Sequence, residues 1–593
     1  MGPEKRKVAE KAKNFKGTIK NLIHYCKPFI IPFVIALILS AISSILSIIG
    51  PDKLKEMTNT ITAGLATEIN MQTISEIGIT LILIYSISLI FNYIQSIMMA
   101  NVTNKFSRHM RQDISKKINR LPLKYFDQST IGDILSRVTN DVDTISQSFD
   151  ESIDAFVSAI TMFIGSTIMM FVINWILALA AILSSIFGFI LITIILGRSQ
   201  KYFIKVQTEI GNINGHIEEV FSGHNIVKAY NAEQEVGDKF NYINNRIFEC
   251  SRKSQFYSGL MQPIMSFIGN FGYVVVCVVG AALAMNGTIS FGVIVAFMIY
   301  VRLFTQPLSQ FAQSFTNFQS MTAAAERVFD FLNEPELTPE SPKKSLLKEE
   351  IKGNVEFSHV KFGYEKDRPI IKDFSAKIKA GQKIAIVGPT GAGKTTLVNL
   401  LMRFYEIDDG DIKIDGTSTK NISRENLHSL FTMVLQDTWL FEGTIKENLR
   451  YNQTHVKNED IENACKIVGI DHLIHTLPKA YDTVLGDIDN LSAGEKQLLT
   501  IARAMLNETP FLILDEATSS VDTRTEELVQ KSMDKLTKGR TSFVIAHRLS
   551  TIKNADLILV LKDGDIIESG NHKTLIEKNG FYADLYNSQF KNA

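Results

Sequence analysis

The chain has 593 residues, enough for about three or four domains, and its 62 basic and 62 acidic side chains leave no formal net charge. This balance argues against nucleic acid as the main partner, because such binding depends on a basic surface. Hydrophobic residues make up 45% and charged residues 21% of the chain, so the two classes must be segregated along it. The four cysteines are scattered without metal-ligand spacing and are expected to be reduced and buried: Cys26, Cys250, Cys277 and Cys465.

The N-terminal half contains six stretches that are apolar enough to cross a bilayer as helices, which takes about 20 residues each. The predicted spans are 29–50, 77–100, 155–174, 176–197, 262–285 and 290–309. Only Asn174 and Trp175 separate the third span from the fourth, so these two must form a tight hairpin. Six buried helices of a large soluble protein are the weaker alternative.

Basic residues set the predicted orientation, because loops rich in Lys and Arg stay in the cytoplasm. They gather in the N-terminal segment 1–28, in 105–120 and in 198–205. Both termini and the long segments 101–150 and 198–260 are therefore predicted to be cytoplasmic.

The two long cytoplasmic segments are polar, with helix-type apolar spacing and few breakers. They are expected to continue the transmembrane helices beyond the membrane and to turn at two tips. One tip is predicted near 125–141, where Gly132 should break the helix, and the other near 214–233, where Gly223 should do so. The predicted fold of 29–335 is an all-α, six-helix transmembrane domain with long cytoplasmic helical extensions.

Three polar side chains fall inside the predicted spans, where they are costly to bury. Arg302 lies about midway along the sixth span, and Asn92 and Gln95 lie in the second. They are candidates for the wall of a substrate path. The alternative is that they only join neighbouring helices within the bundle.

After a linker at 336–350, residues 351–593 alternate strand-like and helix-like runs, as in an α/β nucleotide-binding domain. A strand at 384–387 leads into a glycine loop and an amphipathic helix, and the loop fits the P-loop pattern G-x-x-x-x-G-K-[ST]. Such a loop turns backbone N–H groups toward phosphates, its lysine reaches the β- and γ-phosphates, and its threonine offers a hydroxyl to Mg²⁺. The expected ATP-binding residues of the loop are Gly388, Pro389, Thr390, Gly391, Ala392, Gly393, Lys394, Thr395 and Thr396.

Two further strands carry the residues expected to act on the phosphate. The first, "FLILD", ends in Asp515, a suitable partner for Mg²⁺, and the following Glu516 can polarise the attacking water. The second, "TSFVIAH", places His547 near the same phosphate. Strands that end in acids are common, but beside a P-loop the catalytic interpretation of Glu516 and His547 is favoured.

Over about residues 15–590, these features resemble a half-transporter of the ABC exporter family, in which six transmembrane helices are fused to one nucleotide-binding domain. The resemblance implies that Tyr364 stacks on adenine and that Gln436, in the ATP site, touches Mg²⁺ and reports to the membrane half. It also implies that Asp522 belongs to a loop at the dimer contact, and that the two cytoplasmic tips are coupling helices.

The segment "LSAGEKQ" begins at Leu491, where the family carries its signature, usually L-S-G-G-Q. In the family, this helix N-terminus contacts the γ-phosphate bound to the P-loop of the other subunit. Ser492 and Gly494 match the pattern, whereas Ala493 replaces glycine and Glu495 replaces glutamine. The alanine adds a methyl group at a close approach, and the glutamate adds negative charge near phosphate.

An intact P-loop beside an altered signature resembles one subunit of a heterodimeric exporter, whose partner would be a second half-transporter with an intact signature. A homodimer that tolerates these two substitutions is the alternative. The predicted function is ATP- and Mg²⁺-dependent export of an amphipathic or hydrophobic compound through the bilayer by alternating access. Alternatives are a homodimeric lipid flippase, a peptide exporter, and an ATP-gated channel or regulatory subunit. The many Ile, Lys and Asn residues favour a bacterial plasma (inner) membrane.

Overall fold

The computed structural model describes residues 14–65, 68–338, 340, 345–365, 368–436, 438–485, 491–515, 523–545 and 552–590. The chain divides into two units. Residues Met1–Leu121 and Ser129–Pro335 form the helical unit, and residues Pro122–Gln128 and Glu336–Ala593 form the α/β unit.

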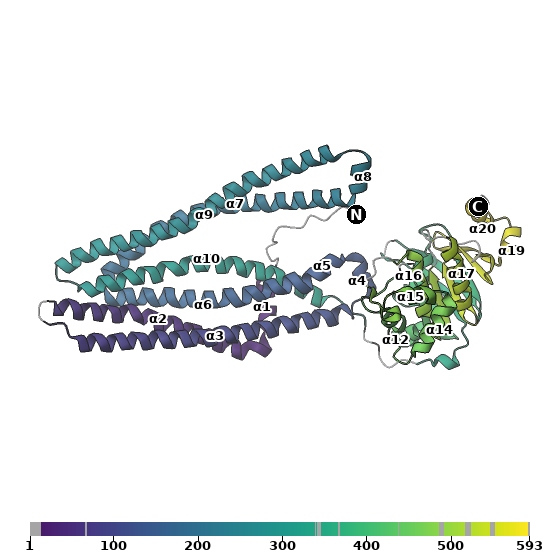
Figure 1. Cartoon of the computed structure of the whole chain (residues 1–593), viewed down its shortest axis with the longest axis horizontal. Helices are drawn as coiled ribbons and strands as arrows, with labels where there is room; N and C mark the ends of the chain where they lie inside the picture. Colours follow the sequence, from purple (N-terminus) through teal and green to yellow (C-terminus); the bar gives the residue numbers. More distant parts are fainter. Residues whose placement is uncertain are drawn as a thin grey trace. The chain divides into compact units, whose positions relative to one another are not determined.

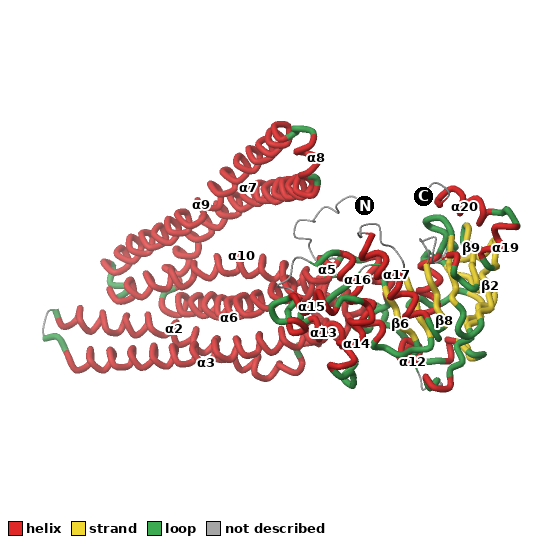
Figure 2. The backbone as a smooth tube through the Cα atoms, turned by 45° about the vertical axis from the view of Figure 1, so that its right-hand side comes forward, coloured by secondary structure: helices red, strands yellow, loops and turns green. Residues whose placement is uncertain are grey.

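The helical unit consists of long helices connected by short turns (Figure 1). Its helices are α1 (Phe15–Tyr25), α2 (Ile30–Gly64), α3 (Met71–Ile118), α5 (Ile131–Ser136), α6 (Val142–Ile173), α7 (Trp175–Ser222), α8 (His224–Ala229), α9 (Glu233–Met285) and α10 (Phe291–Asn333), with a 3-10 turn at Lys27–Phe29 and a π-helical turn at Arg137–Asp141. Helices α2, α3, α6 and α10 pack together, and α7 pairs with α9 along most of its length (Figures 1 and 2).

Five helical stretches in the described residues are long and apolar enough to span a membrane. They are Lys27–Gly64, Met71–Ile118, Ile131–Ile173, Glu233–Met285 and Phe291–Leu308. The sixth expected span, at 176–197, lies in α7, where the described side chains give the shorter apolar stretch Trp175–Ile186. The unit is thus a helical transmembrane domain, as the sequence predicts.

The predicted hairpin between α6 and α7 is present. Asn174 adopts an extended backbone, and its side chain accepts hydrogen bonds from the backbone N–H groups of Ile176 and Leu177 at 3.1 and 3.0 Å. A single asparagine therefore ends one helix and caps the next, because its side-chain oxygen satisfies N–H groups that have no partner within the helix.

The two predicted tips differ from each other in how closely they follow the prediction. Gly223 does follow the last residue of α7, as expected. Gly132 does not break a helix, and this prediction is wrong: it lies in the first turn of α5, after a break at Ser129 and Thr130. The physical reason is the N-cap, since the Thr130 hydroxyl accepts a hydrogen bond from the Asp133 N–H at 3.2 Å and starts the helix there.

The α/β unit has two sheets. Its strands are β1 (Val355–Phe362), β2 (Ile371–Ile378), β3 (Lys383–Val387), β4 (Asp409–Ile414), β5 (Thr417–Ser418), β6 (Phe431–Val434), β7 (Phe511–Asp515), β8 (Thr541–Ile545), β9 (Leu557–Lys562) and β10 (Asp565–Gly570). The smaller sheet is antiparallel, in the order β2-β1-β4-β5. The larger has the order β10-β9-β3-β8-β7-β6 and is parallel except at β10.

Helices flank the strands of this unit, and several share an apolar core with the larger sheet (Figure 2). They are α4 (Leu123–Gln128), α11 (Lys394–Leu401), α12 (Arg424–Ser429), α13 (Ile445–Arg450), α14 (Asn458–Val468), α15 (Asp471–Thr476), α16 (Ala493–Met505), α17 (Thr523–Thr537), α19 (His572–Glu577) and α20 (Phe581–Phe590), with short 3-10 turns at Lys348–Glu350, Thr419–Asn421 and Ala480–Asp482.

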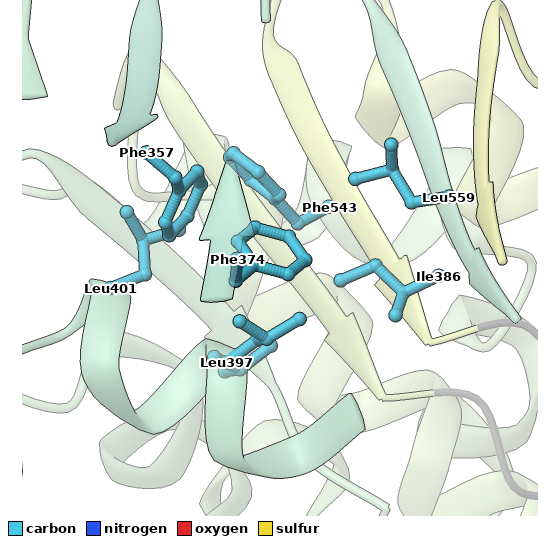
Figure 3. Close-up of a pocket in the computed structure, with 8 residues that line it drawn as sticks. Phe357, Phe374, Ile386, Leu397, Leu401, Phe543 and Leu559 are labelled. Carbon is cyan, nitrogen blue, oxygen red and sulfur yellow. The ribbon is translucent and has the colours of Figure 1, made fainter. Parts of the chain in front are cut away.

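The two sheets and α11 share one apolar core, shown in Figure 3. Phe357 and Phe374 come from the smaller sheet, Phe543 comes from the larger, and Leu397 and Leu401 come from α11. All five side chains are buried, with exposed fractions of 4% or less. This packing fixes α11, and with it the glycine loop at its N-terminus, against the strands.

Candidate nucleotide-binding site

The candidate site lies at the carboxyl edge of the parallel strands. The register pairs Ile386 with Ile545 and Ile545 with Asp515, so these three strand residues form one row across β3, β8 and β7. The glycine loop follows β3 directly, and Gln436 follows the neighbouring strand β6 two residues after Val434. Ligands of open α/β sheets bind at this edge, outside the carboxyl ends of the strands.

Glycines shape the loop because larger residues would not fit. A Cβ atom on Gly388 would lie 2.3 Å from the carbonyl oxygen of Leu561. Gly393 has a φ of 96°, in the left-handed region, and a Cβ there would lie 2.7 Å from Ile371. Gly391 also has a positive φ, of 85°. The loop therefore curls tightly before α11, which is the shape that lets backbone N–H groups surround a phosphate.

Lys394 lies inside this curl, with 9% of its surface exposed. Its ammonium donates hydrogen bonds to the carbonyl oxygens of Gly388 at 2.8 Å and Pro389 at 3.1 Å. Desolvation by burial lowers the pKa of Lys394, and the charge of Asp515 opposes that shift. The loop thus holds one cation at its centre, where an anionic phosphate would compensate the cost of desolvation.

The expected metal-binding residues lie along the same edge. Asp515 ends β7 and is 9% exposed, and its charge acts on Lys394 as described. Thr395 is exposed in the first turn of α11, and Gln436 is exposed after β6. A carboxylate, a hydroxyl and an amide oxygen are hard oxygen donors of the kind that Mg²⁺ prefers, so these residues fit the ion.

Tyr364 lies beside the glycine loop. Its hydroxyl is 3.3 Å from the hydroxyl of Thr396 in α11. The ring packs edge-on against Phe362 and Tyr405, with centroid distances of 5.0 and 5.1 Å. The structure therefore holds this aromatic ring next to the helix of the glycine loop, and its stacking on adenine stays a prediction.

The altered signature forms the start of helix α16, with Ser492 as the N-cap. The Ser492 hydroxyl accepts a hydrogen bond from the Glu495 N–H at 3.3 Å, and the Glu495 carboxylate accepts one from the Ser492 N–H at 2.7 Å. This is a capping box, in which each residue satisfies a backbone donor of the other. Gly494 is buried, Ala493 is exposed and Leu491 packs partly buried against the apolar core that these helices share with the larger sheet. The glutamate therefore places its own negative charge at the N-terminus of this helix.

Three predicted residues, Glu516, Asp522 and His547, lie outside the described residues. Their predicted roles remain predictions. Of the remaining loop residues, Thr390 is exposed and Ala392 is buried at 3%.

Two features of the α/β unit were not expected from sequence. The capping role of Glu495 could have been found, because S-x-x-E before a helical run is the sequence pattern of a capping box. The second feature is a hydrogen bond from the Tyr405 hydroxyl to the carboxylate of Asp127 in α4. Those residues are 278 positions apart, and no local pattern indicates their contact.

The polar residues of the predicted spans differ in exposure. Gln95 is buried within the helical unit, with 3% exposed. Asn92 and Arg302 are exposed on its surface.

A helical membrane domain fused to an α/β domain with a P-loop at the carboxyl edge of its parallel sheet defines a membrane protein driven by nucleotide. Comparison with known proteins narrows this class. Residues 33–308 match the ABC transporter transmembrane region, and residues 371–519 match the ABC transporter family of ATP-binding domains. The chain belongs to the ABC transporter family as a half-transporter, and it couples ATP hydrolysis to transport.

Several relatives are similar over most of their length. The fatty acid ABC transporter ATP-binding/permease protein of Mycobacterium bovis is 46% identical over 477 residues, which cover 80% of this chain and 75% of that protein. The uncharacterized ABC transporter ATP-binding protein YfiC of Bacillus subtilis is 37% identical over 592 residues, or 99% and 97% of the two chains. The probable multidrug resistance ABC transporter ATP-binding/permease protein YheH of Bacillus subtilis is 36% identical over 510 residues, or 85% and 75%.

Proposed function

We propose that this chain is one subunit of a heterodimeric exporter that moves amphipathic or hydrophobic compounds out across a bacterial plasma membrane. Its termini would be cytoplasmic, and transport would proceed by alternating access. The relatives named for fatty acids and for multidrug resistance support a substrate that is apolar over much of its surface. The basic cytoplasmic segments support the orientation.

The observation that carries the heterodimer proposal is the capping of the α16 N-terminus by the side chain of Glu495. A signature helix binds a phosphate of the other subunit's ATP with its free N–H groups and its positive helix end. Here the Glu495 carboxylate already accepts the Ser492 N–H at 2.7 Å. A carboxylate about 6 Å from a phosphate charge costs about 3 kcal/mol at an effective dielectric constant near 20. This signature is therefore expected to support hydrolysis poorly.

The P-loop of the same chain, in contrast to the signature, is well suited to bind phosphate, because it has closely packed glycines and a buried lysine. We infer that this P-loop and Glu516 form an active site together with the intact signature of a different chain. The signature of this chain would complete a degenerate site on that partner's P-loop. The partner thus supplies what "LSAGEKQ" lacks.

Mg²⁺ would be held by Thr395, Gln436 and Asp515, and when bound it would neutralise phosphate charge during hydrolysis. Lys394 would bind the β- and γ-phosphates, and Tyr364 would hold the base. Glu516 would accept a proton from the attacking water, and His547 would contact the γ-phosphate. These roles follow from the resemblance and from the donor types at the sheet edge.

The test of the catalytic proposal is Glu516→Gln in the complete assembly. Because the amide has the size of the carboxylate but cannot accept the proton, ATP binding should persist while turnover falls by about 100-fold or more. Binding is measured with a fluorescent ATP analogue and turnover by phosphate release. Wild-type turnover in this variant would contradict the assignment of Glu516 as the catalytic base. Glu526→Gln, a second glutamate of the same unit in α17, is the matched control and should leave turnover unchanged.

A lipid flippase is the second candidate, favoured by the relative named for fatty acid transport. The two candidates differ in where the substrate ends. A flippase leaves it in the opposite leaflet, whereas an exporter releases it to the aqueous phase. Leaflet-resolved quenching of a fluorescent lipid in proteoliposomes separates them.

A further inference from the structure

Helix α10 carries a stripe of polar side chains within and just beyond its membrane-spanning stretch. Arg302 is followed at helical spacing by Gln306, Gln310, Gln313 and Asn317, four, eight, eleven and fifteen residues later. Residues at these spacings share one face of an α-helix. Arg302, Gln306, Gln310 and Gln313 are exposed, and Asn317 is half-buried. The amide of Gln313 donates to that of Asn317 at 3.2 Å, so the stripe is linked within itself.

The opposite face of α10 is buried against the bundle. Phe297, Tyr300 and Phe304 are 0%, 0% and 6% exposed and belong to the apolar core of the helical unit. Phe304 stacks on Phe163 of α6 at a centroid distance of 4.9 Å. The helix is thus fixed with its apolar face inward, and the polar stripe is left on the surface of this chain.

The stripe stops at Arg302. On the same face but toward the N-terminal end of α10, the side chains are Val295, Met298 and Ile299, all partly exposed. The surface therefore changes from amide and guanidinium groups to apolar side chains at one residue. Arg302 lies about 16 Å from the start of α10 at 1.5 Å per residue, which is near the middle of a bilayer core about 30 Å thick.

Arg302 is the one charged residue in the stretch Phe291–Leu308. Within the described residues, no carboxylate forms an ion pair with its guanidinium. The backbone carbonyl of Arg302 accepts a hydrogen bond from the Thr305 hydroxyl at 3.4 Å. An ionised side chain at this depth needs water or an anion, because lipid chains provide neither. The arginine is therefore suited to a ligand that brings its own negative charge.

We propose that Arg302 binds the carboxylate of a single-chain amphiphile whose hydrocarbon tail lies against Val295, Met298 and Ile299. The polar stripe from Asn317 to Gln306 provides hydrogen bonds for the headgroup along the way from the cytoplasmic side. One guanidinium matches one carboxylate, in charge and in its two parallel N–H groups. This inference rests on the proposed transport function and deepens it by naming the substrate class as long-chain carboxylates.

The test uses the full-length assembly in lipid nanodiscs and two compounds with the same hydrocarbon chain. Oleate carries the carboxylate, and oleamide replaces it by a neutral amide. The measured quantity is the concentration of each that gives half-maximal stimulation of ATP hydrolysis, at about pH 8.5 so that the carboxyl group stays ionised near the membrane. The variants are Arg302→Gln, Arg302→Lys and the matched control Arg198→Gln, which removes another exposed arginine of the helical unit.

Arg302→Gln should raise the half-maximal concentration of oleate by about tenfold or more, because it removes a charge-assisted pair, and should leave that of oleamide unchanged. Arg302→Lys should give an intermediate value, since lysine keeps the positive charge but lacks the two parallel N–H groups of the guanidinium. Arg198→Gln should behave as the wild type. Equal shifts for both compounds, or no shift for oleate, would overturn the proposal.

Transport by the wild type separates this inference from the function on which it rests. ATP-dependent movement of oleate in preference to oleamide into proteoliposomes supports both, and this comparison needs no variant. Equal movement of the two compounds would overturn the carboxylate site alone. Movement of neither would overturn the proposed transport of amphiphiles and this site with it.

Discussion

Gly388 is the residue at which the strand β3 gives way to the phosphate-binding loop, and its missing side chain is required by geometry. In Gly388→Ala, the added methyl group would meet the Leu561 carbonyl oxygen at 2.3 Å, so the backbone must shift. The loop would then lose its fit to phosphate. We expect a fall in ATP affinity of about tenfold or more and a loss of stability of about 1–3 kcal/mol. Nucleotide binding and thermal unfolding of the full chain measure the two effects.

The control for this substitution is Gly215→Ala in α7, where an added Cβ meets nothing within 4 Å. Alanine favours a helix over glycine, so this variant should be neutral or slightly more stable. An unchanged ATP affinity in Gly388→Ala would show that the loop does not need the close approach to β9.

His428 predicts a pH dependence of stability in the α/β unit. Its Nε2 is 2.8 Å from the Met402 carbonyl oxygen, which suits a neutral ring that donates its proton. Burial lowers the pKa of His428, and the charges of Arg424 and Arg403 act in the same direction, while the Met402 bond and Glu340 oppose it. The unfolded chain therefore binds a proton more readily than the folded one.

The stability linked to His428 is fully present above the unfolded-state pKa of about 6.5 and is lost as the pH falls below it toward the depressed folded value. We expect His428→Gln, which keeps a donor for Met402, to weaken this dependence between about pH 7.5 and 5.5. Thermal unfolding of the full chain at several pH values measures it. His572, whose pKa burial also lowers, stays in the variant, so a residual slope of the same sign is expected. An unaltered slope would contradict the role of His428.

At the scale of elements, the sequence predicts those features that depend on interactions between residues close together in the chain. The strand predicted at 384–387 is β3, Lys383–Val387, because an apolar run followed by glycines leaves few alternatives. The break at Gly132 was predicted wrongly, because the hydrogen bond of Thr130 outweighs the mild helix-breaking tendency of one glycine. Glu495 was interpreted only as a charge, although its spacing from Ser492 also makes it a capping residue.

What sequence could not predict are contacts between distant residues. Tyr405 donates its hydroxyl to Asp127 of α4, although the sequence gives no periodicity that relates positions 278 apart. The polar stripe on α10 is a different case. Its helical spacing can be seen in the sequence, but its exposure follows only from the burial of the opposite face of the helix. Sequence patterns therefore predict helix faces and motifs, whereas tertiary packing determines which residues these faces contact.

The short helix α4 yields a prediction about coupling. It belongs to the α/β unit, yet in the chain it connects α3 with α5 of the helical unit. Tyr405→Phe removes the hydrogen bond to Asp127, whose pKa burial raises. We expect a loss of stability of about 1 kcal/mol, with basal ATP hydrolysis retained and its stimulation by transported compounds reduced several-fold. Phosphate release with and without an amphiphile measures the ratio.

Tyr451→Phe is the matched control, since that tyrosine is 58% exposed in the same unit and packs by its ring. It should leave both rates unchanged. If Tyr405→Phe keeps full stimulation, the link through α4 does not transmit the substrate signal.

At the scale of the whole molecule, one chain carries two segments expected to contact ATP, and they differ in the charge that each contains. Its P-loop has a buried lysine and tightly curled glycines, whereas its signature helix has a carboxylate on its own N-terminus. In the ABC exporter arrangement that the sequence resembles, the P-loop of one subunit works with the signature of the other. A homodimer of this chain would therefore place the altered signature at both sites, and a heterodimer would place it at only one.

This difference is testable by restoring the signature. Expressed alone, the chain should hydrolyse ATP slowly, and Ala493→Gly with Glu495→Gln should raise that rate by about tenfold or more, because both sites gain a close approach and lose a repulsive charge. Glutamine still fits the capping box, so helix α16 should remain as stable as before. In an assembly with a second half-transporter that has an intact signature, the same double substitution should change the rate far less, since one site is already complete. Glu495→Gln alone separates the effect of charge from that of the methyl group. If the unaltered chain alone hydrolyses ATP as fast as the restored one, the glutamate is harmless at the phosphate and the need for a different partner disappears.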